Sequence, residues 1–433
     1  MPTTPPMVRH RRADAGPIRA LLLVVVALAV LAPSTPAAAT AFTAGWSAGW
    51  AAAVQPPALP SEWAPPSWST AGFHNQSIRQ VVRVSTGGQW LRIRLSNAYG
   101  AKPLRLTGAS IGKSGTGAAI HEGSIQSLQF ARHASTTIPP AATATSDPVR
   151  LRTTALERLT VTLYFAEQTG PATFHSTGLT TTYRATGDHR SSRSAGAFTG
   201  ETSPSYFYLT GVDVTGGDGR SSGTVVTFGD SITDGYDSTP NADNRYPDEL
   251  AERLVAAGRP LGVANSGIDG NLLLTSSPCF GEAGVARFRR DALDQPGVRA
   301  VIVLLGINDI GSANGPDFGC GSPPDVSAAD LITGHRALIR AAHARGVRII
   351  GATLTPFKGN AYYDTEANQR RRADFNEWMR TSGEYDAVID LDRTLADPAD
   401  PAAMNPIYAS PDRLHPNDAG MTAIAAAVPI SRL

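Results

Sequence analysis

The sequence predicts an all-β sandwich followed by an α/β domain with a parallel sheet, and three observations lead to this fold class. The chain has 433 residues, which is too long for one ordinary domain and sufficient for two. Apolar residues alternate with polar ones in the first half, whereas the second half has short continuous apolar runs separated by helical stretches. A bridge rich in Gly, Ser and Asp, residues 216–223 (GGDGRSSG), separates the two patterns.

Residues 1–39 are expected to be a secretory signal peptide. Arg9–Arg12 and Arg19 form a basic region, an apolar run follows at Ala20–Ala32, and Ala37–Ala39 offer a small-residue cleavage site. The apolar run is shorter than the roughly 20 residues that a transmembrane helix needs. No later stretch is long and apolar enough to span a bilayer. We therefore expect a secreted, extracellular protein with no stable membrane anchor.

Residues 40–215 are predicted to form the β-sandwich. Segments 78–84, 90–95 and 158–165 largely alternate apolar and polar residues between clusters of Gly, Pro, Ser and Thr, as half-buried antiparallel strands do. Five of the six tryptophans lie in this half of the chain. Packing of these rings in the sandwich core or against the second domain is favoured over an exposed platform for stacking sugars.

Residues 224–433 are predicted to form the α/β domain. Apolar runs typical of strands buried on both faces lie at 224–228, 300–305, 347–352 and 387–391. Helices are expected between or after them, at 327–345, 366–381 and 417–427. The first of these helices opens with Ser327 and Asp330, a capping pattern. Alternating strands and helices predict a parallel sheet, whose functional site lies beyond the carboxyl ends of the strands.

Charge and motif content exclude several classes of partner. With 38 Lys and Arg against 37 Asp and Glu, the net charge of +1 gives no basic excess for nucleic acid. The sequence has nine histidines, but no H-E-x-x-H motif and no His/Cys/carboxylate cluster with metal-ligand spacing. His335 and His343, on one predicted helix, are expected to be surface residues. We therefore predict neither a metal nor another cofactor.

Cys279 and Cys320 are the only two cysteines of the chain. In an oxidising compartment such a pair is more often a disulfide than two free buried thiols, so the bridge is favoured over the free thiols. On chain-entropy grounds it would stabilise the fold by about 4 kcal/mol, less any strain.

Four short motifs lie where the sheet predicts a site. They are residues 229–235 (GDSITDG), which follow the strand at 224–228, 264–268 (ANSGI), 306–309 (GIND) and 412–416 (DRLHP). Asp412 and His415 are close enough in sequence for the carboxylate to orient the imidazole. Each motif alone also has an ordinary interpretation, with Gly267 and Asn308 as turn residues and Asp412 as a helix-entry residue.

Taken in order, the four motifs resemble the blocks of the SGNH/GDSL hydrolase superfamily, from about Thr224 to the C-terminus. Ile232 departs from the family's leucine, an apolar exchange. The resemblance implies a flavodoxin-like three-layer α/β/α fold with Ser231 as nucleophile, His415 as general base and Asp412 orienting His415. It also implies an oxyanion hole formed by the backbone N–H groups of Ser231 and Gly267 and by the side-chain amide of Asn308.

The resemblance predicts a serine esterase that acts on carboxylic esters, either small molecules or polysaccharides. The alternatives are a polysaccharide (xylan-type) O-acetyl esterase, a long-chain lipase, or a carbohydrate-binding surface module that retains a hydrolase fold. Residues 75–100 also look like the N-terminal region of two-domain actinobacterial members of the superfamily. Cys279 and Cys320 follow the loops that carry Gly267 and Asn308, so we expect a disulfide to steady those loops.

One further motif has the wrong context for a site. Residues 45–49 (GWSAG) match the G-x-S-x-G nucleophile elbow of α/β-hydrolases. That elbow requires a buried strand before the serine and a helix after it, and the sequence predicts neither here. We therefore expect no catalytic role for this segment.

Overall fold

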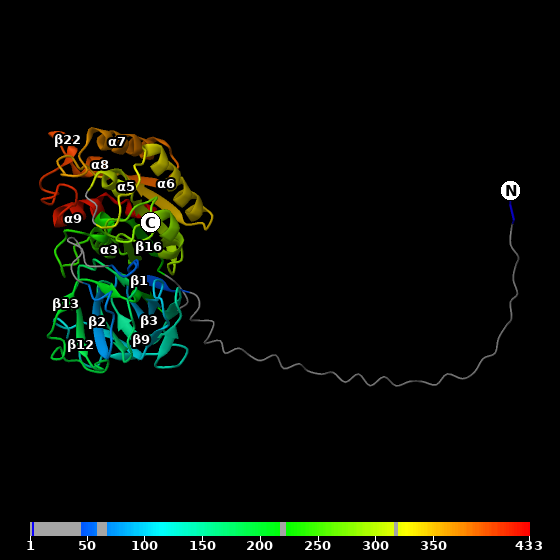
Figure 1. Cartoon of the computed structure of the whole chain (residues 1–433), viewed down its shortest axis with the longest axis vertical. Helices are drawn as coiled ribbons and strands as arrows, with labels where there is room; N and C mark the ends of the chain where they lie inside the picture. Colours follow the sequence, from blue (N-terminus) through cyan, green and yellow to red (C-terminus); the bar gives the residue numbers. More distant parts are fainter. Residues whose placement is uncertain (1, 4–44, 59–66, 217–221, 316–318) are drawn as a thin grey trace.

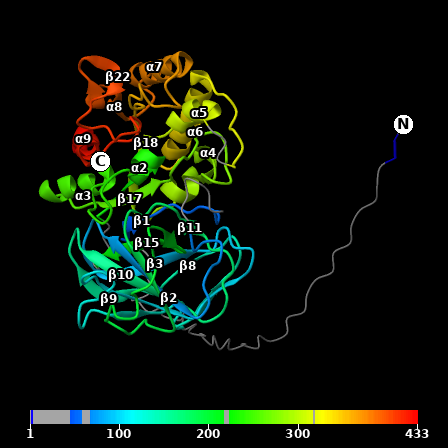
Figure 2. The ribbon, with the colours of Figure 1, turned by 60° about the vertical axis from the view of Figure 1, so that its left-hand side comes forward.

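The computed structural model describes residues 2–3, 45–58, 67–216, 222–315 and 319–433. The predicted signal peptide, apart from residues 2–3, and most of the predicted linker lie outside these residues. Two layered units lie one above the other, a β-rich one from the first half of the chain and an α/β one from the second (Figures 1 and 2). Among the described residues, no helix combines the length and the apolar composition needed to cross a bilayer.

The first unit consists mainly of two antiparallel sheets. One has the strand order β1 (Ser47–Ala51), β15 (Leu209–Thr215), β3 (Gly88–Ser96) and β8 (Thr143–Thr145), with β9 (Val149–Thr153) also paired to β3. The other has the order β13 (Thr202–Ser203), β12 (Thr182–Thr186), β2 (Gln76–Arg83), β10 (Arg158–Phe165), β5 (Gly108–Lys113) and β6 (Gln126–Leu128). Two short pairs complete the unit, β11 (Phe174–His175) with β14 (Tyr206–Phe207), and β4 (Leu104–Leu106) with β7 (Thr136–Ile138).

The apolar face of each sheet turns inward to form the sandwich core. Leu159, Val161 and Leu163 of β10 are completely buried there, as their alternation predicts. Trp50 and Trp68 also belong to this core, where Trp68 stacks on Phe207 with ring centroids 5.6 Å apart. The interpretation of these two tryptophans as core residues is therefore confirmed, whereas Trp63 lies outside the described residues.

The outer face of β10 differs from the prediction of half-buried strands. Thr160 and Thr162, which alternate with the core residues, are fully buried as well. On the same sheet the buried Arg79 guanidinium donates to the carbonyl oxygens of Ala118 and Ser194, at 2.6 and 2.9 Å. Long connections thus cover this face, and backbone carbonyls on them accept from the Arg79 guanidinium in place of water.

The second unit is built on a parallel sheet covered by helices. Its strand order is β17 (Gly262–Gly267), β16 (Thr224–Gly229), β18 (Val298–Leu304), β19 (Arg348–Ala352) and β20 (Ala387–Ile389). The α-helices are α2 (Ser231–Asp234), α3 (Tyr246–Ala256), α4 (Gly284–Phe288), α5 (Ile307–Gly311), α6 (Ala328–His343), α7 (Glu366–Thr381), α8 (Leu391–Leu395) and α9 (Asp418–Ala427). Shorter elements are the π-helix η1 (Arg289–Leu293), the 3-10 helices η2 (Ser312–Asn314) and η3 (Ile430–Arg432), and the hairpin β21 (Ala396–Asp397)–β22 (Asp400–Met404).

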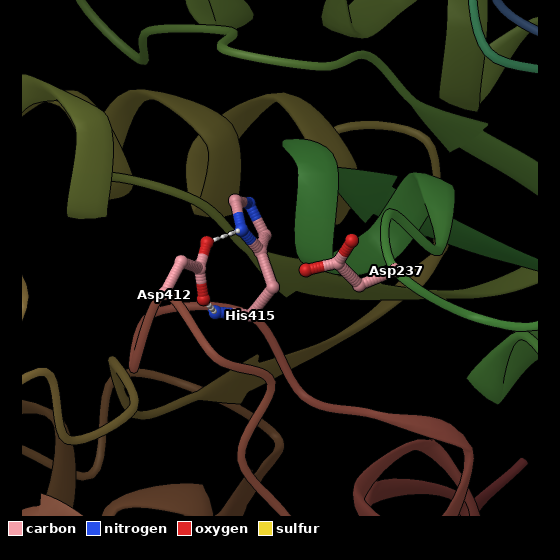
Figure 3. A group of neighbouring side chains, drawn as sticks. All are labelled: Asp237, Asp412 and His415. Atoms are coloured by element: carbon pink, nitrogen blue, oxygen red, sulfur yellow. Dashed lines mark hydrogen bonds and ion pairs between the residues drawn. The ribbon is translucent and has the colours of Figure 1, made fainter.

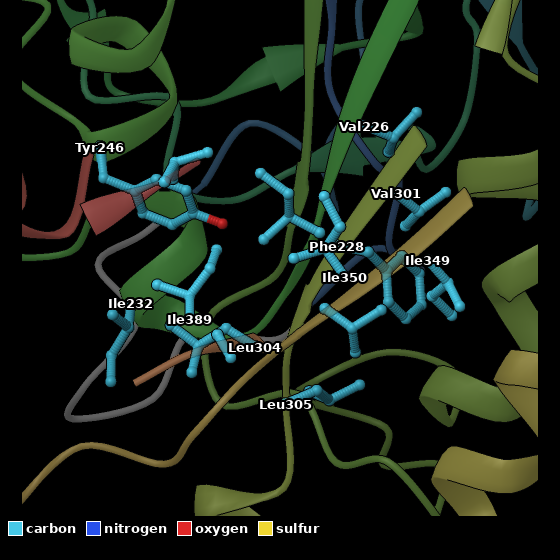
Figure 4. Packing of buried hydrophobic residues seen from close by; sticks show 14 of the residues in the cluster. Val226, Phe228, Ile232, Tyr246, Val301, Leu304, Leu305, Ile349, Ile350 and Ile389 are labelled. Atoms are coloured by element: carbon cyan, nitrogen blue, oxygen red, sulfur yellow. The ribbon is translucent and has the colours of Figure 1, made fainter. Parts of the chain in front are cut away.

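The predicted strands and helices of this unit agree closely with the structure. Val226, Val301 and Ile350, on the three central strands, pack in one buried cluster (Figure 4). Helix α6 begins with the expected capping box between Ser327 and Asp330. His335 on that helix is not a surface residue, which corrects the sequence interpretation. Its ring bonds the Tyr385 hydroxyl at 2.5 Å and the Leu305 carbonyl at 3.0 Å, and burial lowers its pKa to about 4.

Strand β1 joins the two units. The Ala48 N–H donates to Thr224 Oγ1 at 3.0 Å, and the Val263 N–H donates to Ser85 Oγ at 2.7 Å. Ser47, the serine of the G-x-S-x-G match, is buried at this interface. The segment is therefore an interface strand of the sandwich, as its lack of a following helix indicates.

Candidate active site

Ser231 is the first residue of α2, directly after strand β16. Asp230 caps the helix by accepting the Ile232 N–H at 3.1 Å. A side chain at Gly229 would lie 2.1 Å from Thr233 Oγ1 and 2.3 Å from the Leu304 carbonyl oxygen, so the tight turn needs glycine. The GDS motif thus places a serine at the carboxyl edge of the parallel sheet with its backbone N–H at a helix N-terminus.

Asp412 and His415 lie on the loop that precedes α9, and the loop fixes both of them locally. The His415 carbonyl oxygen accepts the Ser410 N–H at 2.9 Å. Asp412 Oδ1 accepts the backbone N–H groups of Leu414 and His415, at 2.9 and 3.0 Å. Asp412 Oδ2 remains for the imidazole of His415, which bonds it through Nδ1 at 2.5 Å (Figure 3).

The three predicted triad residues form one hydrogen-bonded chain. Ser231 Oγ lies 2.8 Å from His415 Nε2, on the side of the ring opposite Asp412. Because the Asp412 carboxylate only accepts, His415 Nδ1 carries the proton and Nε2 accepts from the serine hydroxyl. Burial raises the pKa of Asp412, but its hydrogen bonds and charge interaction with His415 outweigh burial, so the net pKa is lowered. The chain of contacts suits transfer of a proton from Ser231 to His415.

Asp237 brings a second carboxylate close to this chain. Asp237, Asp412 and His415 place potential ligand atoms within 4.8 Å of one another, and they are the one such group among the described residues (Figure 3). Both ring nitrogens of His415 already bond Ser231 and Asp412. A cation at this place would have to replace those hydrogen bonds, so the arrangement fits proton transfer better than metal binding.

Asn308, at the start of α5, directs its side-chain amide toward the segment after β17. Its Nδ2 donates one hydrogen to the Asn271 carbonyl oxygen at 3.0 Å, which leaves a second N–H. The hydroxyl of Tyr363 donates to Asn308 Oδ1 at 2.8 Å and so fixes which end of the amide is oxygen. Burial raises the pKa of Tyr363 to about 12, so the phenol stays protonated as a donor.

Tyr363 was not singled out from the sequence. It lies in the turn before α7, 55 positions after Asn308, and no local pattern connects the two. Its ring occupies the space where a side chain at position 311 would be. The pairing of Tyr363 with Asn308 depends on how the chain folds back.

The backbone N–H of Gly267, predicted as an oxyanion donor, is committed elsewhere in this structure. It donates to Asn265 Oδ1 at 2.9 Å, and the residue ends strand β17 beside β16. A side chain at this position would lie 2.2 Å from the Asp234 nitrogen, so glycine is needed for close packing against α2. The N–H of Gly270, three residues later, has no hydrogen-bond acceptor among the described residues. Gly270 is also next to Asn271, whose carbonyl oxygen accepts from the Asn308 amide.

Two more acidic residues, Asp309 and Asp230, are buried beside this site. Burial raises the pKa of Asp309 to about 6, and its carboxyl accepts the Leu273 and Leu274 N–H groups at 2.7 and 3.0 Å. Burial also raises the pKa of Asp230 to about 7, despite its cap hydrogen bond to Ile232. Asp309 thus ties α5 to the segment after β17.

Cys279 and Cys320 form a disulfide with Cα atoms 5.8 Å apart, as predicted. Next to it lies a cavity of about 130 Å³. Its lining residues are Leu272, Thr275, Ser276, Ser277, Phe280, Ser312, Cys320, Gly321, Ser322, Pro323 and Pro324. The Phe280 ring fills the space where a side chain at Gly270 would be, and Ser312 Oγ lies 3.3 Å from the Tyr363 hydroxyl. The cavity is therefore adjacent to the segment that holds the Asn308 amide.

The family model that matches this chain covers only its α/β unit. Residues 227–423 match the GDSL-like Lipase/Acylhydrolase family. No curated protein is similar enough in sequence to match the chain.

Solved structures are similar over about half of the chain. A lipase/acylhydrolase from Enterococcus faecalis is 19% identical, covers 47% of this chain and 92% of its own, and has a TM-score of 0.37. An acetyl xylan esterase is 20% identical, with 47% and 96% covered and a TM-score of 0.36. A carbohydrate acetylesterase family member from Sinorhizobium meliloti is 16% identical, with 48% and 97% covered and a TM-score of 0.38.

Proposed function

Because residues 227–423 carry a domain of the GDSL-like lipase/acylhydrolase family, we propose that this protein is a secreted serine esterase that hydrolyses carboxylic esters. The proposal depends above all on one observation. Ser231 Oγ, the His415 ring and the Asp412 carboxylate form a continuous chain, with contacts of 2.8 and 2.5 Å, inside the residues that match the family. Secretion rests on the predicted signal peptide.

In the proposed reaction Ser231 Oγ attacks the carbonyl carbon of the ester, and its proton passes to His415 Nε2. Asp412 stabilises the imidazolium that forms. The imidazolium then protonates the leaving alcohol, which leaves an acyl group on Ser231. Water, deprotonated by His415, attacks that acyl group and releases the acid and the free serine.

Negative charge on the carbonyl oxygen is proposed to be stabilised by the Ser231 N–H and by the second N–H of the Asn308 amide. Ser231 begins α2, so its N–H has no acceptor within the helix. For the third donor, Gly270 is a better candidate than Gly267, whose N–H donates to Asn265. Each such donor contributes on the order of 3 kcal/mol to the transition state.

The cavity beside the disulfide favours short acyl groups among the possible substrates. Its volume of about 130 Å³ is about ten times the roughly 10–15 Å³ that one water molecule needs on the same measure. An acyl chain of a few carbons fits such a space in full. We propose that this cavity receives the acyl part of the ester, since it adjoins the Asn308 side of the site.

The test is a rate profile on p-nitrophenyl esters from acetate to palmitate, with acetylated xylan as a further substrate and Ser231→Ala as the control. We expect Ser231-dependent turnover that falls steeply beyond butyrate. Acetate release from xylan would identify the polysaccharide deacetylase, and a preference for palmitate would identify a lipase and contradict the short-acyl pocket. Absence of Ser231-dependent turnover on every ester, together with binding of Ser231→Ala to insoluble glycan, would replace the esterase by a binding module.

A further inference from the structure

The β-sandwich reaches the candidate active site through one short segment. His175 ends β11, and Thr177 follows two residues later. His175 Nε2 lies 3.0 Å from Asp234 Oδ1, and the Thr177 hydroxyl donates to Asp269 Oδ2. The sandwich therefore contacts two carboxyl groups of the other unit, 59 and 92 positions away in sequence.

Both carboxyl groups belong to the elements that carry the site. Asp234 is the last residue of α2, which begins with Ser231. Asp269 lies between Gly267 and Gly270, on the segment whose Asn271 carbonyl holds the Asn308 amide. The Ile268 N–H donates to the Gly229 carbonyl oxygen at 3.2 Å, so this segment and the serine turn are already in contact.

The protonation of this cluster follows from its partners. The His175 Nε2 also lies 3.3 Å from the Thr177 carbonyl oxygen, which only accepts, so Nε2 carries the proton. His175 Nδ1 is buried with no partner among the described residues, which suits the neutral tautomer. Asp234 accepts from His175 and Asp269 accepts from Thr177, yet Asp234 Oδ2 and Asp269 Oδ1 are both buried without any other partner.

Two neighbouring buried carboxylates cannot both stay charged at low cost. Burial raises the pKa of Asp269 well above its ordinary value, and the negative charge of Asp234 raises it further. The other charged or titratable groups that interact with the pair are His175, Asp230, Tyr206 and Tyr236. The raised pKa of Asp269 favours a protonated carboxyl, whose hydroxyl would be the donor that Asp234 Oδ2 lacks.

We propose that His175 and Thr177 of the β-sandwich are positioning residues of the esterase site, which hold the Ser231 helix against the oxyanion segment through a proton shared by Asp234 and Asp269. The sandwich is then part of the catalytic unit and not a separate module. Loss of the shared proton at alkaline pH leaves two buried negative charges that push α2 and the segment 267–271 apart. This inference rests on the proposed esterase function.

Matched variants separate positioning from simple packing. Thr177→Val removes the hydroxyl at constant size, and Thr177→Ser restores it. His175→Leu removes the N–H, and His175→Gln offers an amide N–H at similar reach. A misplacement of about 1 Å costs on the order of 100-fold in rate, so we expect Thr177→Val and His175→Leu to lower kcat by roughly 10-fold to 100-fold with little change in KM. Thr177→Ser and His175→Gln should stay within a few-fold of the wild type.

Asp269→Asn tests the shared proton itself. The amide nitrogen donates to Asp234 at every pH, and the amide oxygen still accepts from Thr177. We expect the wild type to lose kcat on the alkaline side and Asp269→Asn to retain it to higher pH. The unfolded chain releases the Asp269 proton above the ordinary pKa of about 4, whereas the folded wild type keeps it to higher pH. The free energy of unfolding of the wild type therefore falls as pH rises between the unfolded and the folded pKa of Asp269. The Tm of Asp269→Asn should therefore exceed that of the wild type increasingly from acidic to alkaline pH.

The experiment measures kcat and KM on p-nitrophenyl acetate from pH 5 to 9.5, the rate at which a fluorophosphonate probe labels Ser231, and Tm, for the full mature chain. Folded Thr177→Val with wild-type kcat and labelling rate, or identical pH profiles of kcat for Asp269→Asn and the wild type, would overturn the inference. If Thr177→Val and His175→Leu do not fold, the Asp269→Asn profiles decide. A wild type that neither turns over esters nor labels at Ser231 would instead refute the proposed function.

Discussion

Two sets of acidic residues lie near Ser231. Asp412 is one, the pair of Asp234 and Asp269 is the other, and the two sets differ in burial, in pKa and in whether their partners are local or come from the other unit. Asp412 is part of an exposed loop, and its side chain remains 37% accessible while it bonds His415 three positions away. Asp234 and Asp269 meet residues of another unit, and the Asp234 side chain is only 1% accessible. Hydrogen bonding and charge lower the pKa of Asp412, whereas burial raises the pKa of Asp269.

The difference shows how environment assigns roles to one residue type. An ionised carboxylate suits the stabilisation of an imidazolium, and the local loop supplies the donors that keep Asp412 charged. A protonated carboxyl suits a buried contact between elements, because it donates a hydrogen bond without adding charge. The exposed Asp412 is thus suited to chemistry, and the buried pair to holding the geometry of the site.

The largest effect is expected at the exposed group. His415→Ala removes the base and should lower kcat on the order of 10⁵-fold or more, and Asp412→Ala about 10⁴-fold. Steady-state kinetics on p-nitrophenyl acetate measures both, with circular dichroism as the check on folding. A loss for Asp412→Ala of only a few-fold would show that backbone contacts alone orient His415, and the division between the two groups would fail on this side.

The next effect concerns the side-chain amide of Asn308. Asn308→Ala removes an oxyanion donor and should lower kcat by about 10² to 10³-fold with little change in KM. Tyr363→Phe leaves the amide in place but removes the hydroxyl that orients it, so we expect a smaller loss, about 10-fold in kcat. Both variants are measured on the same ester. A fall in kcat for Tyr363→Phe as large as that for Asn308→Ala would mean that the tyrosine does more than orient the amide.

The smallest effect on rate is expected from the disulfide. Cys279 and Cys320 are 41 positions apart in sequence. Replacing both by Ser opens the loop between them and should lower the free energy of unfolding by about 4 kcal/mol. Because the bridge borders the cavity beside the oxyanion segment, activity should fall several-fold at temperatures below the unfolding transition. Thermal melts and kinetics with and without reductant measure this, and unchanged turnover in the reduced, folded enzyme would contradict a steadying role.

Much of the fold follows from local patterns in the sequence. The apolar runs at 224–228 and 347–352 appear as β16 and β19, and helix α7 has the predicted bounds of 366–381. These predictions succeed because a strand buried on both faces needs continuous apolar residues, and a helix needs its own periodicity and caps. The half-buried prediction for the sandwich strands was wrong for β10, whose outer face is covered by connections with no periodicity of their own.

In the candidate site, too, local contacts were predictable from the sequence, whereas contacts between distant residues were not. Asp412 and His415 lie three residues apart, so their contact was predictable from the loop alone. Three features required the folded chain. They are the Tyr363 hydrogen bond to Asn308, the Asn265 acceptor that occupies the Gly267 N–H, and the contact of His175 with Asp234.

The sequence by itself determined the order of two units, the strands and helices of the parallel sheet, and the serine, histidine and carboxylate proposed for catalysis. Only the tertiary structure decided which backbone donors remain free and which carboxyl groups have a raised pKa. The physical reason is that burial and hydrogen-bond partners depend on residues brought together from distant parts of the chain, such as His175 and Asp234. Residue types reveal what chemistry a side chain can perform, and its surroundings decide the charge with which it performs it.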